Sequence, residues 1–249
     1  MNLNIDINRK KFLNDGYFII KNFFNKKEIS IINNEIVKSK NTEIYKDSNN
    51  KIRRIEKFYN KGKFLKEING RFIDLIWNIL NLKYLIFKDK FNLKPPHGEG
   101  FFAHYDGIFY FKNAKNKIKK GWYEYGNLFI NVLVAIDNCN SKNGTIELSK
   151  SHKNNFEKLI KNTKNDGTPN LLEKIEKKIS FKKINLKSGD LVIFKNTCPH
   201  RSKKNKTKYN RRILYYTYLD RKFGSQYNTY FKDKKLSKNK SSKSLSGEK

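Results

Sequence analysis

The sequence predicts a mainly β protein with flanking helices, built as a double-stranded β-helix (a cupin-like jelly roll). Many short runs rich in β-branched and aromatic residues alternate with turn signals along most of the 249 residues. Helical periodicity is concentrated before residue 82, and no internal repeat is visible. Many short strands together with early helices are the pattern expected of a jelly roll with flanking helices.

The N-terminal part begins with a strand and a helix. Residues 17–20 are bulky and follow an Asp-Gly turn, so they predict a short strand. Asn25 and Glu28 have the spacing of an N-cap and its reciprocal acid, which predicts a helix through about Val37. Both elements have a structural role.

The remaining elements follow from turn clusters and apolar periodicity. Apolar residues that recur every three or four positions predict helices that pack on a sheet, and compact apolar runs between turn signals predict strands. In chain order we expect a hairpin at 44–58, one or two helices at 64–80, and strands at 84–93, 127–136 and 145–148. After the turn Gly189-Asp190 we expect a strand that ends on His200, then a polar loop and a strand that begins on Arg211.

Two histidine-containing segments stand out in a chain with only four histidines. His104 and Asp106 are two residues apart, and residues i and i+2 of a strand share one face at a spacing of about 6–7 Å. His200 follows an apolar run that begins after the turn Gly189-Asp190. Two imidazoles and one carboxylate on one face of a metal ion are the ligand set of non-haem Fe(II) oxygenases, and they leave positions open for a co-substrate and O2. The three side chains are therefore candidate metal ligands.

The sequence resembles the phytanoyl-CoA dioxygenase family of Fe(II)/2-oxoglutarate-dependent oxygenases. The resemblance covers roughly residues 13–220. It rests on His104-Tyr105-Asp106, on the segment Asn143–His152, and on Gly189-Asp190 followed by His200 and Arg211.

The resemblance implies an enzyme, an Fe(II)- and 2-oxoglutarate-dependent dioxygenase that hydroxylates a small polar metabolite with O2 and releases succinate and CO2. It implies that His104, Asp106 and His200 hold Fe(II). It also implies that Arg211, eleven residues after His200, binds the distal carboxylate of 2-oxoglutarate with help from Ser202. A guanidinium suits this role because it is always charged and grips a carboxylate in a bidentate fork. The presence of Asp106 favours hydroxylation, since halogenating relatives carry a small residue there.

Three nearby features need a separate interpretation. His152 is the competing histidine, but it follows a turn and lacks a paired acid, so we interpret it as structural. Residues 107–126 combine lysines with aromatic residues, and a substrate lid and a packed loop are equally compatible with them. Arg212, adjacent to Arg211 on a strand, is expected to point to the opposite face.

The formal net charge of +32 and the pI near 10.0 ordinarily indicate nucleic acid or an anionic membrane as a partner. The excess comes from 47 Lys and only 8 Arg, scattered over every segment. Nucleic-acid binders tend to cluster basic residues and to use Arg for bidentate contacts. An A/T-rich codon bias therefore explains the charge better, and a small-molecule substrate is the expected partner. A nucleic-acid demethylase of the same superfamily and a non-catalytic jelly-roll binding protein are the alternative functions.

The remaining sequence features indicate the domain organisation and the cellular location of the protein. Two cysteines without metal-type spacing exclude a disulfide framework, and no apolar run reaches membrane-spanning length, so a cytoplasmic location is expected. We expect a single domain over residues 1–231. Residues 232–249 are rich in Lys and Ser and predict a disordered tail.

Overall fold

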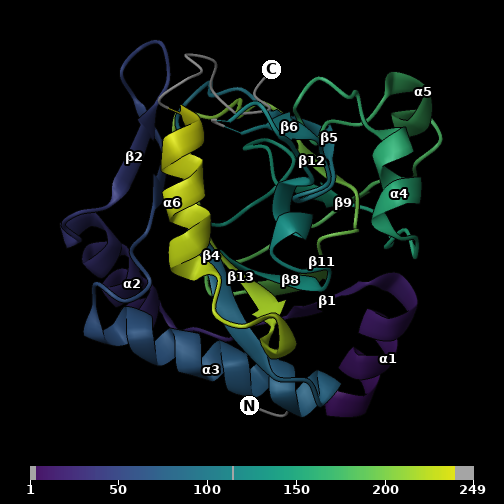
Figure 1. The fold of residues 1–249 in the computed structure, drawn as a ribbon. Coiled ribbons are helices and arrows are strands. Elements are labelled where there is room, and N and C mark those ends of the chain that lie inside the picture. The colour runs from purple at the N-terminus through teal and green to yellow at the C-terminus, as the bar shows by residue number, and fades with distance from the viewer. Residues whose placement is uncertain (1–3, 114, 239–249) are drawn as a thin grey trace.

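Two antiparallel sheets form the centre of the protein, and helices surround them. The computed structural model describes residues 4–113 and 115–238 (Figure 1). Within these residues the larger sheet consists, in spatial order, of β1 (Tyr17–Ile20), β11 (Leu191–Lys195), β8 (Phe129–Ala135), β13 (Arg211–Asp220), β4 (Tyr84–Lys94), β3 (Ile52–Glu56) and β2 (Glu43–Lys46). The smaller sheet consists of β10 (Lys182–Lys183), β9 (Ile146–Leu148), β12 (His200–Ser202) and β5 (Phe101–His104). The predicted jelly roll is confirmed.

The two faces of the larger sheet bury different clusters. Ile213 and Tyr215 of β13 point into the jelly roll and pack with residues of the smaller sheet. Leu214 and Tyr216 point the opposite way, toward the helices. This alternation is the period of two that a strand imposes. Leu133 of β8, which is paired with Tyr215, also points inward.

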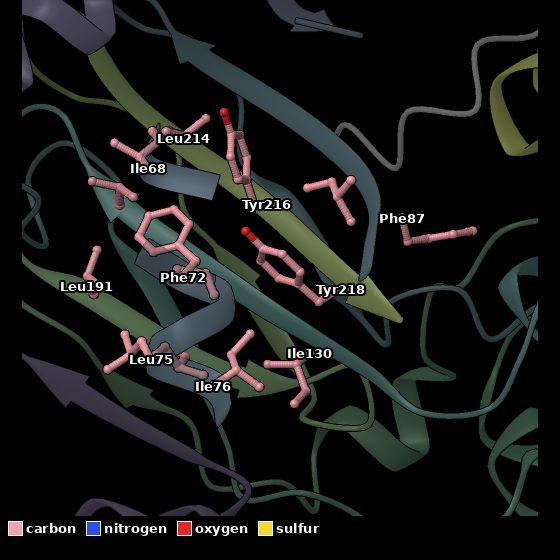
Figure 2. Packing of buried hydrophobic residues seen from close by; sticks show 14 of the residues in the cluster. Ile68, Phe72, Leu75, Ile76, Phe87, Ile130, Leu191, Leu214, Tyr216 and Tyr218 are labelled. Carbon is pink, nitrogen blue, oxygen red and sulfur yellow. The ribbon is translucent and has the colours of Figure 1, made fainter. Parts of the chain in front are cut away.

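A layer of helices covers the outer face of the larger sheet (Figure 1). It contains α1 (Ile5–Asp15), α2 (Lys26–Lys38) and α3 (Lys63–Leu80). Ile68 and Phe72 of α3 lie against Leu214 and Tyr216 of the sheet, and Ile76 lies beside Ile130 (Figure 2). Each such side chain contributes about 1.5–3 kcal/mol on full burial, so this layer stabilises the sheet from the side opposite the jelly-roll interior.

Local sequence signals set several of these elements. Asn25 accepts from the backbone N–H of Glu28, and Glu28 accepts from that of Asn25, so the predicted capping box of α2 is confirmed. β2 and β3 form the predicted hairpin, and Asp47 accepts two backbone N–H groups of its turn. The sequence does not predict α1, because Phe12 is its one fully buried residue and the helical periodicity is faint.

Short elements connect the sheets. They are β6 (Phe111–Lys112), β7 (Ile118–Lys119), η1 (Gly121–Glu124), α4 (Phe156–Leu159), η2 (Ile160–Asn162), α5 (Glu173–Glu176) and η3 (Arg221–Phe223). In the described part of the chain, no helix has both the length and the apolar character needed to cross a membrane.

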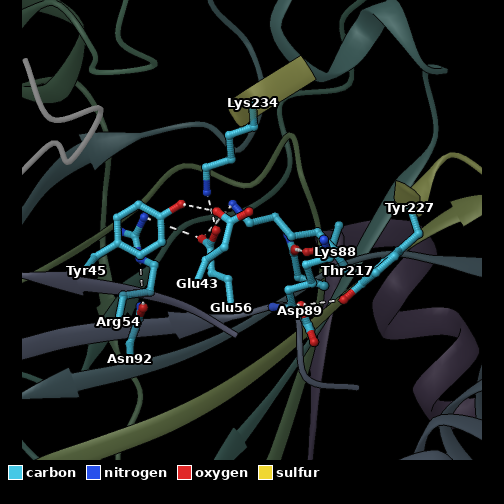
Figure 3. Close-up of polar contacts among 12 residues, drawn as sticks. Glu43, Tyr45, Arg54, Glu56, Lys88, Asp89, Asn92, Thr217, Tyr227 and Lys234 are labelled. Carbon is cyan, nitrogen blue, oxygen red and sulfur yellow. Dashed lines mark hydrogen bonds and ion pairs between the residues drawn. The ribbon is translucent and has the colours of Figure 1, made fainter. Parts of the chain in front are cut away.

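The C-terminal helix α6 (Tyr227–Lys238) corrects the expectation of a disordered tail from residue 232. Tyr230 and Phe231 are buried in the helix-side core, and Lys234 donates to Glu56, which is fully buried on β3 (Figure 3). The sequence suggests a solvated Lys-rich segment because α6 is polar on average, and the buried carboxylate that binds Lys234 lies far away in the chain. Residues 239–249 of the expected tail lie outside the described residues.

The contact between α6 and β3 predicts a difference between two adjacent lysines. Lys234→Met leaves Glu56 with Lys88 and Arg54 only, so it should lower the free energy of unfolding by about 2–3 kcal/mol, somewhat below the cost of breaking a buried pair completely. Lys235→Met, at an exposed position, should change it by less than about 0.5 kcal/mol. Urea denaturation measures both, and equal stabilities would show that the ion pair does not hold α6.

Candidate metal centre

Three of the predicted residues meet where two strands of the smaller sheet pair. His104 ends β5 and His200 begins β12, and the two residues are partners in the register. Asp106 follows β5 by two residues. Their potential ligand atoms all lie within 4.8 Å of one another, and His200 Nε2 lies 3.6 Å from Asp106 Oδ2. The strand pairing therefore brings together residues from two distant parts of the chain.

Both imidazole rings are oriented through the same nitrogen. His104 Nδ1 lies 2.7 Å from the carbonyl oxygen of Phe102, and His200 Nδ1 lies 3.0 Å from that of Cys198. A carbonyl can only accept, so Nδ1 carries the proton in each ring and Nε2 keeps its lone pair. Burial lowers the pKa of His104 to about 3, and it also lowers the pKa of His200. Both rings are therefore neutral at pH 7, which is the form that binds a metal.

The carboxylate of the cluster is held by a residue that the sequence analysis did not identify. Asn131 Nδ2 on β8 donates to Asp106 Oδ2 at 2.9 Å, and Thr217 Oγ1 on β13 donates to Asn131 Oδ1 at 2.7 Å. Burial alone would raise the pKa of Asp106, but the attraction of His200 and Lys90 outweighs it and the pKa lies below its ordinary value. An asparagine inside an otherwise apolar strand is the sequence signal that could have found this residue.

Arg211 and Ser202 lie in the pocket that the three-residue cluster lines. Arg211 begins β13, is 2% exposed, and its Nε has no hydrogen-bond partner among the described residues. The Ser202 hydroxyl accepts from Lys94 Nζ at 2.8 Å. Lys94 is 1% exposed and also donates to the carbonyl of Lys203. One end of the pocket therefore contains two buried cations, Arg211 and Lys94.

The two competing residues lie elsewhere. His152 is outside the cluster, and its Nδ1 contacts the hydroxyl of Tyr105, whose side chain packs in a separate apolar group behind β5. Arg212 forms an ion pair with Asp137 and donates to Asn33 of α2 on the outer side of the sheet. Arg211 and Arg212 thus point to opposite faces, as expected.

The described residues of the segment 107–126 contribute to one wall of the pocket. Phe109, Phe111 and Trp122 line the pocket. Gly107 has φ +74°, and a Cβ there would lie 2.3 Å from Trp122 Cγ, so the wall is packed tightly where it starts. The segment therefore packs on the body of the protein and lines the pocket at once.

Fold and cluster together define a jelly-roll protein with a candidate site of two histidines and one carboxylate for a mononuclear metal. The sequence profile of the phytanoyl-CoA dioxygenase (PhyH) family matches residues 12–213, and the chain belongs to this family.

Two characterised relatives have names that refer to phosphonates. The chain is 28% identical over 185 residues to the 2-aminoethylphosphonate dioxygenase of uncultured bacterium HF130_AEPn_1, covering 73% of this chain and 64% of that one. It is 25% identical over 169 residues to the methylphosphonate hydroxylase of Gimesia maris, covering 68% of this chain and 58% of that one. The chain thus spans less than two thirds of the length of either relative.

Solved structures support the fold. The carbocyclase SnoK from nogalamycin biosynthesis superposes with a TM-score of 0.67 at 12% identity, covering 88% of this chain and 85% of that one. EctD from S. alaskensis, solved with 2-oxoglutarate and 5-hydroxyectoine, superposes with a TM-score of 0.65 at 16% identity, covering 85% of this chain and 74% of that one. At these identities the likeness concerns the fold.

The cluster geometry predicts which histidines bind a metal. Replacing His104, Asp106 or His200 by Ala should abolish tight Fe(II) binding, because two ligands hold a divalent ion far less well than three. His152→Ala should retain it. Anaerobic Fe(II) titration of the four variants, with circular dichroism to verify folding, gives the answer, and an effect confined to His152→Ala would refute the assignment.

The orientation of Asp106 by Asn131 leads to a second expectation. Asn131→Ala should lower the affinity for Fe(II) by about 10- to 100-fold, the usual cost of losing a hydrogen bond that orients a metal ligand. Thr217→Val, which removes the donor to Asn131, should have a smaller effect in the same direction. The same titration measures both variants, and unchanged affinity in Asn131→Ala would show that Asp106 needs no such support.

Proposed function

We propose that this protein is an Fe(II)- and 2-oxoglutarate-dependent dioxygenase that hydroxylates a small-molecule substrate. The observation that carries the proposal is the combination of two features in one pocket. The His104–Asp106–His200 cluster has neutral imidazoles with free Nε2 atoms, and Arg211 is a buried guanidinium without an acidic partner among the described residues. A metal ion and a dicarboxylate are the two ligands that would satisfy both features.

The residues present fit Fe(II). His104 and His200 would bind through Nε2 because their Nδ1 atoms are used by backbone carbonyls, and Asp106 would supply the third ligand. Asn131 would keep the Asp106 carboxylate in place as the metal binds. Three protein ligands leave the rest of the coordination sphere for the co-substrate and O2.

The residues at the other end of the pocket fit the distal carboxylate of 2-oxoglutarate. Arg211 offers an unsatisfied Nε–H and a fork that matches a carboxylate. Because the Ser202 hydroxyl accepts from Lys94, its own proton is free to donate to the same carboxylate. Lys94 adds a second positive charge at this end.

When bound, Fe(II) and 2-oxoglutarate supply the oxidation of the substrate by O2 with release of succinate and CO2. The chain positions the reactants and excludes water. Apolar and aromatic side chains, among them Phe101, Phe109 and Tyr215, line the pocket. Such a lining strengthens the charge interactions inside and limits side reactions.

The names of the two characterised relatives suggest where to start with substrates. Both names refer to small phosphonates, and the interior of the pocket is rich in positive charge. We therefore propose a small polar metabolite as the substrate, with organophosphonates as the first candidates.

Formation of succinate tests the proposal. The wild-type protein, with Fe(II), ascorbate and air, should convert 2-oxoglutarate to succinate, slowly by itself and faster with a substrate. Asp106→Ala should make none. If the folded wild type binds Fe(II) and yet forms no succinate with any candidate, the chain is a non-catalytic binding protein instead.

Arg211 and Arg212 form a matched pair for the co-substrate. Arg211→Ala should weaken the binding of 2-oxoglutarate by roughly 2–5 kcal/mol, the scale for losing one side of a buried charge pair. The affinity for Fe(II) should stay unchanged. Arg212→Ala should leave 2-oxoglutarate affinity unchanged, because Arg212 faces α2. Anaerobic titration of 2-oxoglutarate into the Fe(II) protein compares them. A larger loss in Arg212→Ala would mean that the other face of β13 binds the co-substrate.

A further inference from the structure

The strand β4 turns a row of polar side chains toward the pocket. Lys88, Lys90 and Asn92 line it, whereas the alternating residues Asp89 and Phe91 lie on the helix-covered face. Lysines are rarely placed inside a domain unless a partner compensates the cost of burying the charge. Each lysine of the row therefore needs an identified partner.

Most cations near this wall have an acidic partner. Glu56, 0% exposed, binds Lys88 at 3.4 Å and Arg54 at 3.7 Å, and it accepts from Lys234 (Figure 3). Three basic side chains share this one carboxylate, so basic groups outnumber acidic groups around it. On the opposite wall, Arg201 is bound by two carboxylates.

Lys90 is the exception. It is half-buried, and its Nζ lies 4.3 Å from the centre of the Tyr215 ring. Its Nζ has no hydrogen bond and no ion pair with any residue that the structure describes. Of the acids that line the pocket, Asp106 belongs to the metal cluster and Asp233 accepts from Tyr125. Burial lowers the pKa of Lys90 to about 7, as expected for a cation that lacks a partner.

Lys90 and Arg211 lie at different levels of the pocket. Lys90 is paired with Tyr215 in the register of β4 and β13, whereas Arg211 is paired with Lys94. The two levels are four residues apart, or about 13 Å along the strands. The metal cluster lies two residues beyond the Lys90 level, on the side away from Arg211, because Asn131, which holds Asp106, is paired with Thr217. Thr217 is in turn paired with Lys88. The pocket therefore has two separate positions for an anion.

We propose that Lys90 binds an anionic group of the substrate, a phosphonate or chemically similar oxyanion, and is the residue that selects anionic substrates. This inference rests on the proposed function, in which Arg211 binds 2-oxoglutarate. The ammonium group of Lys90 forms an ion pair with the oxyanion, and the excess of basic side chains around Glu56 adds a favourable field. The substrate is thereby held beside the metal cluster, with its reactive carbon adjacent to the anionic group.

Methylphosphonate tests this inference directly. Under anaerobic conditions it is titrated into the Fe(II)- and 2-oxoglutarate-loaded protein, and the change in the iron-to-2-oxoglutarate absorption band reports binding. Lys90→Met keeps the length of the side chain and removes the charge. It should lower the affinity for methylphosphonate by at least about 30-fold and the affinity for 2-oxoglutarate by less than about 3-fold. Lys90→Arg should stay within about 5-fold of wild type for both.

A surface lysine provides the control. Lys182→Met on β10 removes the same charge at an exposed position outside the pocket and should leave both affinities unchanged. Equal methylphosphonate affinity in Lys90→Met and wild type would overturn the inference. So would a loss of 2-oxoglutarate affinity as large as in Arg211→Ala, because Lys90 would then serve the co-substrate.

The wild type separates this inference from the proposed function. If it forms the Fe(II)–2-oxoglutarate band but binds neither methylphosphonate, 2-aminoethylphosphonate nor inorganic phosphate, the anion site is refuted and the oxygenase proposal stands. If it forms no such band, both proposals fail.

Discussion

The pairing of β12 with β5 is the constraint on which the site depends. His200 lies opposite His104, and each ring is fixed by a backbone carbonyl two residues before it, Phe102 or Cys198. A slip of one residue in this register would turn one of the two histidines to the other side of the sheet and separate the ligand atoms. The two strands are short, so their positions depend on the larger sheet and on the apolar cluster between the sheets.

The two faces of the larger sheet have different roles, since one stabilises the fold and the other carries the polar residues of the pocket. Its outer face buries apolar side chains against α3, while its inner face carries Asn131, Thr217, Lys90 and Arg211 toward the pocket. Polar groups inside a protein cost free energy unless they are hydrogen-bonded or paired. Asn131 and Thr217 satisfy each other and Asp106, whereas the charges of Lys90 and Arg211 call for bound anions. The helix layer offsets the cost of keeping these cations inside.

The sequence predicted the parts of the structure that have local signals. The capping box at Asn25, the hairpin turn at Asp47 and the alternation in β13 depend on near neighbours in the chain, and the resemblance to a family identified the segments around His104 and His200. Long-range polar contacts had no such signal. The ion pair that fixes α6 joins two distant elements, and the role of Asn131 depends on a side chain of another strand. The row of lysines on β4 is inconspicuous in a chain with 47 of them.

An anaerobic crystal structure of the protein with Fe(II) and 2-oxoglutarate tests the central claim most directly, because it locates both ligands at once. The account predicts a metal bound by Nε2 of His104, Nε2 of His200 and the carboxylate of Asp106, with the distal carboxylate of 2-oxoglutarate on Arg211. A metal bound by His152, or a distal carboxylate held away from Arg211, would contradict it.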